Sequence, residues 1–147
     1  MPRQGGCAVP LMPSRVKHRK SHKASLKGEA TSGNFVAFGE YGLQALERAW
    51  LESRQIEAGR VAINRHLKRK GKLWVRVFPD RPMSKKPLEV RMGKGKGPPE
   101  FWIAAVRRGT MLFEIDGVPE PLACSAMRLA ASKLPFRTRF VSRRNQV

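Results

Sequence analysis

The chain has 147 residues, with 30 Lys and Arg against 11 Asp and Glu, and its net charge at pH 7 is +19. That length fits one domain with tails, and 41% hydrophobic residues are enough for a buried core, so a wholly disordered chain is excluded. Such a charge draws a protein to polyanions, here nucleic acid or an anionic membrane. No apolar stretch is long enough to span a bilayer, which excludes a membrane-spanning protein, and nucleic acid is the leading candidate.

Residues 1–33 form a predicted basic arm, extended when free and ordered by its partner, because large apolar residues are few. Its composition overlaps with that of organellar transit peptides, but the prolines and glycines and the lack of an amphipathic period favour an arm. His18 and His22 have a spacing at which one helix face can hold a metal, yet the neighbouring cations disfavour a metal ion. The expected phosphate contacts from the arm are Arg15, Lys17, His18, Arg19, Lys20 and Lys23.

The next segment predicts a strand over 34–38, a turn over 39–42, a short helix over 43–50 and a main helix from about 53 to 70. Gly71 stands where a helix C-terminal cap belongs. Gly59 inside the helix costs about 1 kcal/mol relative to Ala, which a closely packed neighbour would explain. The end of this helix could be only a solvated cationic turn, but few acids offset its other cations. Its candidate RNA ligands are Arg54, Arg60, Arg65, Lys68 and Arg69.

Residues 73–78 alternate as a predicted strand, in which Arg76 lies between two aromatic residues. Arg76 could stack on them, reach RNA or simply pack at the edge of the core. A loop over 79–87 and a strand over 88–92 lead into a glycine-lysine loop, and residues 101–106 return as the partner strand of a long hairpin. A further strand is predicted over 111–115. In an extended backbone Lys94 and Lys96 would share one side, and three glycines would leave the other side bare.

This loop suits a phosphate-lined surface better than catalysis. A Walker phosphate loop needs a hydroxyl residue after its lysine and a helix behind it, whereas here glycines and two prolines follow. The alternative is a flexible tip without a binding function, whose lysines only keep the chain soluble. The charge of the whole chain argues against this alternative. The candidate ligands of the hairpin are Lys86, Arg91, Lys94 and Lys96.

The C-terminal part predicts a helix that starts at Pro119 or Pro121 and stops before Pro135, then a strand over 136–141. Arg137 and Arg139 lie on one face of this strand and are further candidate RNA ligands. The order of elements predicts an α+β fold with two helices packed on a mostly antiparallel sheet. We divide the chain into the arm, one domain over 34–142, and a basic end over 143–147.

No Ser-His-acid set, Cys-His set or metal cluster can be assembled, so we expect no enzyme, no catalytic residue, no cofactor and no metal. Cys7 and Cys124 lie far apart, so we expect no disulfide and a reducing compartment. Two alternatives stay open at this point. One is a free-standing RNA chaperone or nucleic-acid compacting protein, and the other is an enzyme acting on an acidic substrate.

From Met12 to Val141 the chain resembles the bacterial-type family of large-subunit ribosomal protein sixteen. Several stretches carry the resemblance in order along the chain: RVKHRK at 15–20, RQIEA at 54–58, GKLWVRVFPD at 71–80, KPLEVRMGKGKG at 86–97, FWIA at 101–104, Gly109 and FEIDGV at 113–118. Residues 1–11 have no counterpart, so we expect Met12 to be the habitual start. Gly59 stands where alanine is common, and Glu47 and Glu52 flank a region that is usually basic or neutral.

The resemblance implies an α/β-hammerhead sandwich lodged in large-subunit (23S-type) rRNA, one copy per subunit, beside neighbouring ribosomal proteins and with no membrane contact. It implies contacts to A-site tRNA, with P-site tRNA as a further candidate, near the peptidyl-transferase centre. Arg91, Lys94 and Lys96 at the tip match the family pattern, as do Arg15, Lys17, Arg19 and Lys20 in the arm. A bacterial-type ribosome implies a cytoplasmic location, with an organellar ribosome as the alternative.

Overall fold

The structure, a computed structural model, describes residues 11–23 and 25–143. The described part contains these helices and strands in chain order: β1 Tyr41–Ala45, β2 Ala49–Glu52, α1 Ser53–His66, β3 Lys72–Val75, β4 Arg81–Ser84, β5 Pro99–Val106, β6 Met111–Asp116, α2 Glu120–Ala131 and β7 Thr138–Ser142. Apart from Leu11, the predicted extension over 1–11 lies outside the described residues, and so does the C-terminal end after Arg143.

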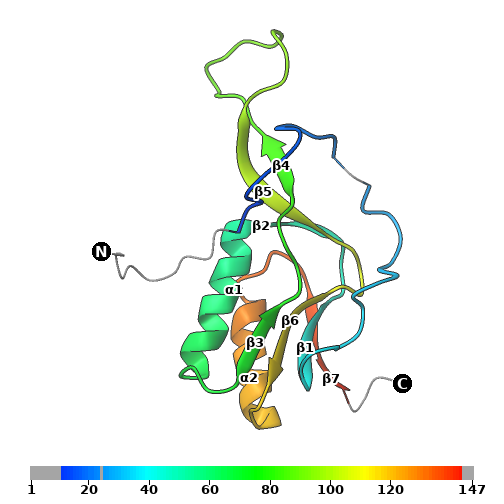
Figure 1. Ribbon diagram of the computed structural model, residues 1–147, viewed down its shortest axis with the longest axis vertical. Coiled ribbons are helices and arrows are strands. Elements are labelled where there is room, and N and C mark those ends of the chain that lie inside the picture. Colours follow the sequence, from blue (N-terminus) through cyan, green and yellow to red (C-terminus); the bar gives the residue numbers. More distant parts are fainter. Residues whose placement is uncertain (1–10, 24, 144–147) are drawn as a thin grey trace.

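The strands form two antiparallel sheets, one of four strands in the order β3-β6-β1-β7 and one of three in the order β2-β5-β4. The helices α1 and α2 pack on each other, and α2 also packs on β1 of the larger sheet. Figure 1 shows both helices beside the larger sheet, with the β4–β5 hairpin extending from the opposite end of the molecule. The predicted α+β class with two helices and antiparallel strands is confirmed, while the hammerhead form stays a prediction.

The core lies between the helices and strand β6. Phe113 and Ile115 of β6, Ile56 and Ile63 of α1, and Met127 of α2 are at most 1% exposed. The aromatic ring of Phe113 also explains Gly59, because a Cβ at that position would lie 2.8 Å from the ring's Cζ atom. The close neighbour that the sequence required is therefore this ring.

The prediction for residues 34–50 was wrong. Residues 34–38 do not form a strand, and the backbone N–H groups of Ala37 and Phe38 donate to the Glu114 carboxylate. The predicted turn and short helix are strands β1 and β2, and β1 is the strand between β6 and β7. A strand that is buried on both faces lacks the alternation of apolar and polar residues that marks a half-exposed strand. Sequence periodicity therefore did not indicate β1.

Helix α1 begins where predicted, with the Gln55 side chain accepting the Glu52 N–H at 3.0 Å. It ends at His66 instead of Lys70, because Lys68 and Arg69 adopt positive φ angles of 50° and 62°. Gly71 follows with a φ of +76°, and a Cβ there would lie 2.5 Å from the Asp116 carbonyl oxygen. Glycine is required at that turn.

Three predictions around the hairpin were also wrong. Strand β3 stops at Val75, and the predicted loop over 79–87 contains β4, whose Pro82 is tolerated because β4 lies at a sheet edge. The predicted strand over 88–92 is an exposed loop, because the pairing of β4 with β5 ends at Ser84 and Pro99. Pro98 and Pro99 have no N–H to extend that pairing.

The C-terminal predictions are close to the structure. Helix α2 has Pro119 as its N-terminal cap and Glu120 in its first turn, and it ends at Ala131 before Pro135. Strand β7 begins two residues later than expected, at Thr138. Arg137 and Arg139 are both exposed, as their spacing predicts.

Candidate nucleic-acid interface

The hairpin loop, residues 85–98, connects β4 to β5 and is closed at its base. The Lys85 N–H donates to the Pro98 carbonyl at 3.3 Å, and Gly97 is buried so tightly that a Cβ would lie 2.6 Å from the Lys85 oxygen. Higher up, the Lys86 ammonium donates to the Gly93 carbonyl at 2.5 Å. The loop is therefore held across its width by its own backbone and by one lysine.

The tip of the loop is not extended. Gly93, Lys94 and Gly95 have φ angles of 99°, 56° and 82°, so three successive residues turn left-handed. A Cβ at Gly93 or Gly95 would have nothing within 4 Å, so these two glycines serve the turn and not a close approach. The expectation that Lys94 and Lys96 share one side assumed an extended backbone, and the backbone here is not extended.

The first described stretch of the arm, residues 11–23, runs beside this loop. The Lys20 ammonium donates to the Lys96 carbonyl at 2.8 Å, and the Lys96 ammonium donates to the Ser21 carbonyl at 2.7 Å. Figure 1 shows the arm next to the β4–β5 hairpin, although the two are distant in sequence. Arg91 and Lys94 have no hydrogen bond or ion pair from their side chains within the described residues.

The arm and the hairpin loop together present a dense positive charge. Residues 11–23 carry five Lys and Arg and no Asp or Glu, and residues 85–98 carry five Lys and Arg and one Glu. Of the predicted ligands here, only Lys86 is half-buried; the exposed ones are Arg15, Lys17, His18, Arg19, Lys20, Lys23, Arg91, Lys94 and Lys96.

A second cationic cluster lies at the C-terminal end of α1. A pocket there is lined by Val61 and Asn64 together with Arg60, Arg65, Lys68 and Arg69. Arg60 also pairs with Glu57 at 2.5 Å; this hydrogen bond lowers the pKa of Glu57 and raises that of Arg60. In Figure 1 the end of α1 lies opposite the hairpin loop along the long axis of the molecule, so these cations form a separate surface.

The other predicted ligands are scattered. Arg54 opens α1 near Met12 of the arm, in a shallow pocket with Phe101 and Trp102. On β7, Arg139 donates to the Gln44 side chain at 2.9 Å, and Arg137 lies 3.6 Å from the Glu47 carboxylate. Both contacts are solvent-exposed, so they leave these arginines accessible to a partner.

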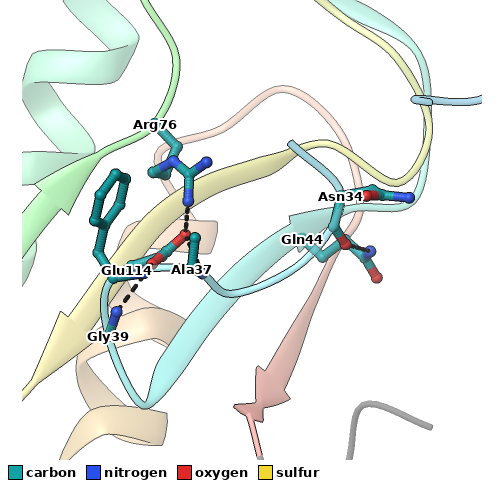
Figure 2. Close-up of polar contacts among 7 residues, drawn as sticks. Asn34, Ala37, Gly39, Gln44, Arg76 and Glu114 are labelled. Atoms are coloured by element: carbon teal, nitrogen blue, oxygen red, sulfur yellow. Dashed lines mark hydrogen bonds and ion pairs between the residues drawn. The ribbon is translucent and has the colours of Figure 1, made fainter. Parts of the chain in front are cut away.

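Arg76 is the predicted ligand with the strongest internal contacts. Its guanidinium pairs with the fully buried Glu114 carboxylate and lies 4.6 Å from the centre of the Phe38 ring. Figure 2 shows Glu114 between Arg76 and the backbone of Ala37 and Gly39. The stacking alternative for Arg76 is thus the one the structure contains, although the ring belongs to Phe38 and not to Trp74 or Phe78.

Sequence reasoning missed Glu114. Its signal was a single acid inside the otherwise apolar run 111–115, which forms most of strand β6, Met111–Asp116. A buried carboxylate is stable only when donors surround it, and here three backbone N–H groups and one guanidinium do so. It orders the segment before β1, and its side chain is fully buried.

Within the described ranges, no three His, Cys, Asp or Glu side chains are grouped as they would be around a metal ion. The same part of the chain has no helix long and apolar enough to cross a membrane.

Comparison with known proteins gives one clear result. The family model described as Ribosomal protein L16p/L10e matches residues 13–141, nearly the whole chain. Proteins of this family associate with large-subunit rRNA and with other ribosomal proteins, and they act in translation. The chain therefore belongs to the Ribosomal protein L16p/L10e family and is a structural constituent of the large ribosomal subunit.

Proposed function

We propose that the arm and the hairpin loop bind large-subunit rRNA as one unit and contact A-site tRNA, with P-site tRNA as a further contact. In this role the protein positions tRNA near the peptidyl-transferase centre and carries out no covalent step. The α1 cluster and the arginines of β7 supply further rRNA contacts on other faces, with one copy of the chain in each subunit.

The observation that carries this proposal is a pair of hydrogen bonds between the arm and the hairpin loop. The Lys20 ammonium donates to the Lys96 carbonyl, and the Lys96 ammonium donates to the Ser21 carbonyl. They bring two strongly cationic segments together, and the resulting repulsion is relieved when phosphates neutralise both. Each Lys or Arg that contacts a phosphate releases condensed counterions, which makes binding favourable and strongly salt-dependent.

Exposed apolar side chains also indicate that the hairpin loop is a binding surface. Leu88 is 100% and Met92 is 99% exposed, and both belong to the hairpin loop. Large apolar groups in full contact with water indicate a surface that a partner covers. RNA offers both phosphates for the lysines and unstacked base faces for such side chains.

The two lysines of the tip differ in their internal contacts, which allows a sharp test. The Lys96 ammonium donates to the Ser21 carbonyl, whereas the Lys94 side chain makes no hydrogen bond within the described residues. Lys94→Ala should lower the salt slope of rRNA binding by about one unit, since one phosphate contact is lost and no internal bond is broken. Lys96→Ala should also release the arm from the loop, which hydrogen exchange in residues 15–23 of the free chain would report.

The matched control is Lys133→Ala, an exposed lysine after α2 whose side chain makes no hydrogen bond or ion pair within the described residues. If Lys94→Ala and Lys133→Ala have the same salt slope as the unaltered chain, the hairpin loop does not bind rRNA and the proposal fails. Recovery of the native protein mainly in free nucleoprotein, away from large subunits, would instead favour the chaperone alternative.

A further inference from the structure

A polar groove contains cations that neither the arm nor the hairpin loop includes. It lies between residues 25–32, the segment that leads from β3 to β4, and the end of β5. Its lining contains Ser25, Thr31, Ser32, Arg76, Asp80, Arg81, Arg107 and Thr110. Of the arginines, only Arg76 belongs to the surfaces described above.

The walls of the groove are fixed by backbone hydrogen bonds. The Ala30 N–H donates to the Arg108 carbonyl at 2.9 Å, and the Met111 N–H donates to the Gly33 carbonyl at 2.8 Å. Arg76 is held in place by Glu114 and by the Phe38 ring. The groove is therefore formed before any ligand arrives.

Apart from Arg76, the charged side chains of the groove have no polar partner in the part of the chain that the structure describes. Within the described residues, the side chains of Arg81, Arg107 and Asp80 make no hydrogen bond or ion pair, although Arg81 is half-buried. Because Glu114 neutralises Arg76, the positive field inside the groove comes from the other two arginines. A half-buried guanidinium without an acceptor favours binding of an anion.

The Asp80 carboxylate argues against a bare phosphate ion, because it would repel that ion at short range. A ribose-phosphate unit satisfies both charges, since its phosphate accepts from arginine and its 2′-hydroxyl donates to a carboxylate. The 2′-hydroxyl is also the group that distinguishes RNA from DNA.

We propose that this groove binds one ribose-phosphate unit of an RNA backbone, with Arg81 and Arg107 on the phosphate and Asp80 on the 2′-hydroxyl. The proposal deepens the proposed function, on which it rests, by adding an RNA-discriminating site apart from the hairpin loop. The hydroxyls of Thr31, Ser32 and Thr110 are available as further donors.

The first experiment maps binding of a short single-stranded RNA to the full chain by NMR. Addition of RNA should shift the amide signals of Ala105 and Thr110 in the unaltered chain, and these shifts should be lost in the double variant R81A/R107A. That variant should also lower the salt slope by about one to two units. The matched control is R48A/R128A, which removes two exposed arginines outside the groove. Equal slopes and equal shifts in the two double variants would overturn the proposal.

The second experiment compares RNA with DNA of the same sequence. If Asp80 accepts the 2′-hydroxyl, Asp80→Ala should lower the ratio of RNA to DNA affinity several-fold. If Asp80 only repels phosphate, the variant should bind RNA and DNA more tightly by the same factor, which would contradict its role. Circular dichroism of each variant checks that the fold is intact.

The two proposals can fail separately. If the groove variants behave like their control while Lys94→Ala still lowers the salt slope of rRNA binding, only the groove proposal is overturned. Absence of any rRNA contact at the hairpin loop would remove the proposed function, while the NMR shifts on short RNA would still report on the groove.

Discussion

Gly59 is the residue at which helix propensity and core packing oppose each other most directly. Gly59→Ala gains about 1 kcal/mol of helix propensity. It also forces a methyl group against the fully buried Phe113 ring, at 2.8 Å, and overpacking of this kind costs roughly 1–3 kcal/mol. We expect a net loss of about 1 kcal/mol in the free energy of unfolding, measured by chemical denaturation.

The neighbouring Ala58 is exposed on the same helix and provides the control. Ala58→Gly should cost about 1 kcal/mol through propensity alone. If Gly59→Ala instead stabilised the fold by about 1 kcal/mol, the Phe113 ring would move aside at no cost, which would contradict the packing described here.

The Glu57–Arg60 pair predicts a small dependence of stability on pH. The hydrogen bond from Arg60 lowers the folded-state pKa of Glu57 below its ordinary value of 4.5. The pair therefore stabilises the fold above pH 4.5, and its contribution is lost as the pH falls through the lowered value. The side chains are 27% and 31% exposed, so the effect is about 0.3–0.5 kcal/mol.

Glu57→Gln measures this contribution directly. Its free energy of unfolding should lie below that of the unaltered chain at neutral pH, and the two should converge in acid. A difference that stays constant from neutral pH into acid would mean that the ionised form of Glu57 is not what stabilises the fold.

At the scale of elements, Glu114 connects strand β6 to the segment before β1. Its carboxylate accepts from the N–H groups of Ala37, Phe38 and Gly39 and pairs with Arg76. Glu114→Gln leaves the Arg76 charge without its partner, and breaking a buried pair in this way costs about 3–5 kcal/mol. Amide exchange at Phe38 and Gly39 should accelerate more than exchange in β7.

Glu120→Gln is the control, because Glu120 is an exposed acid in the first turn of α2. Loss of its interaction with the helix dipole costs about 0.3–1 kcal/mol. If Glu114→Gln were no more destabilising than this control, the carboxylate would not be what holds the segment before β1.

The sequence predicts elements well where one signal dominates. Helices α1 and α2 have apolar stripes and cap residues, and both lie close to their predicted starts. The segment over 34–50 has no such signal, because Leu43, Leu46 and Trp50 fit a helical period by chance. Its outcome depends on Glu114, which lies 75–77 residues further along the chain than the backbone N–H groups of Ala37, Phe38 and Gly39 that it accepts from. A local pattern cannot contain that information.

At the scale of the whole molecule, the residue types of the candidate interface follow from the sequence, but their arrangement does not. Charge and glycine content indicate the arm and the hairpin loop correctly as cationic segments. The Lys96 ammonium donates to the arm, whereas the Lys94 side chain makes no hydrogen bond within residues 11–23 and 25–143, and the backbone over 93–95 turns left-handed. A local sequence pattern does not contain this difference. The groove with Arg81 and Arg107 was missed, because its walls come from segments that only the fold brings together.

The most direct test of the central claim is a density map of the large subunit that contains this chain. The account predicts that residues 11–23 and 85–98 lie side by side within rRNA, with Arg91 and Lys94 at phosphate distance and the Lys20–Lys96 contact in place. A map in which the hairpin loop points into solvent, with no nucleotide near Arg91 or Lys94, would contradict it.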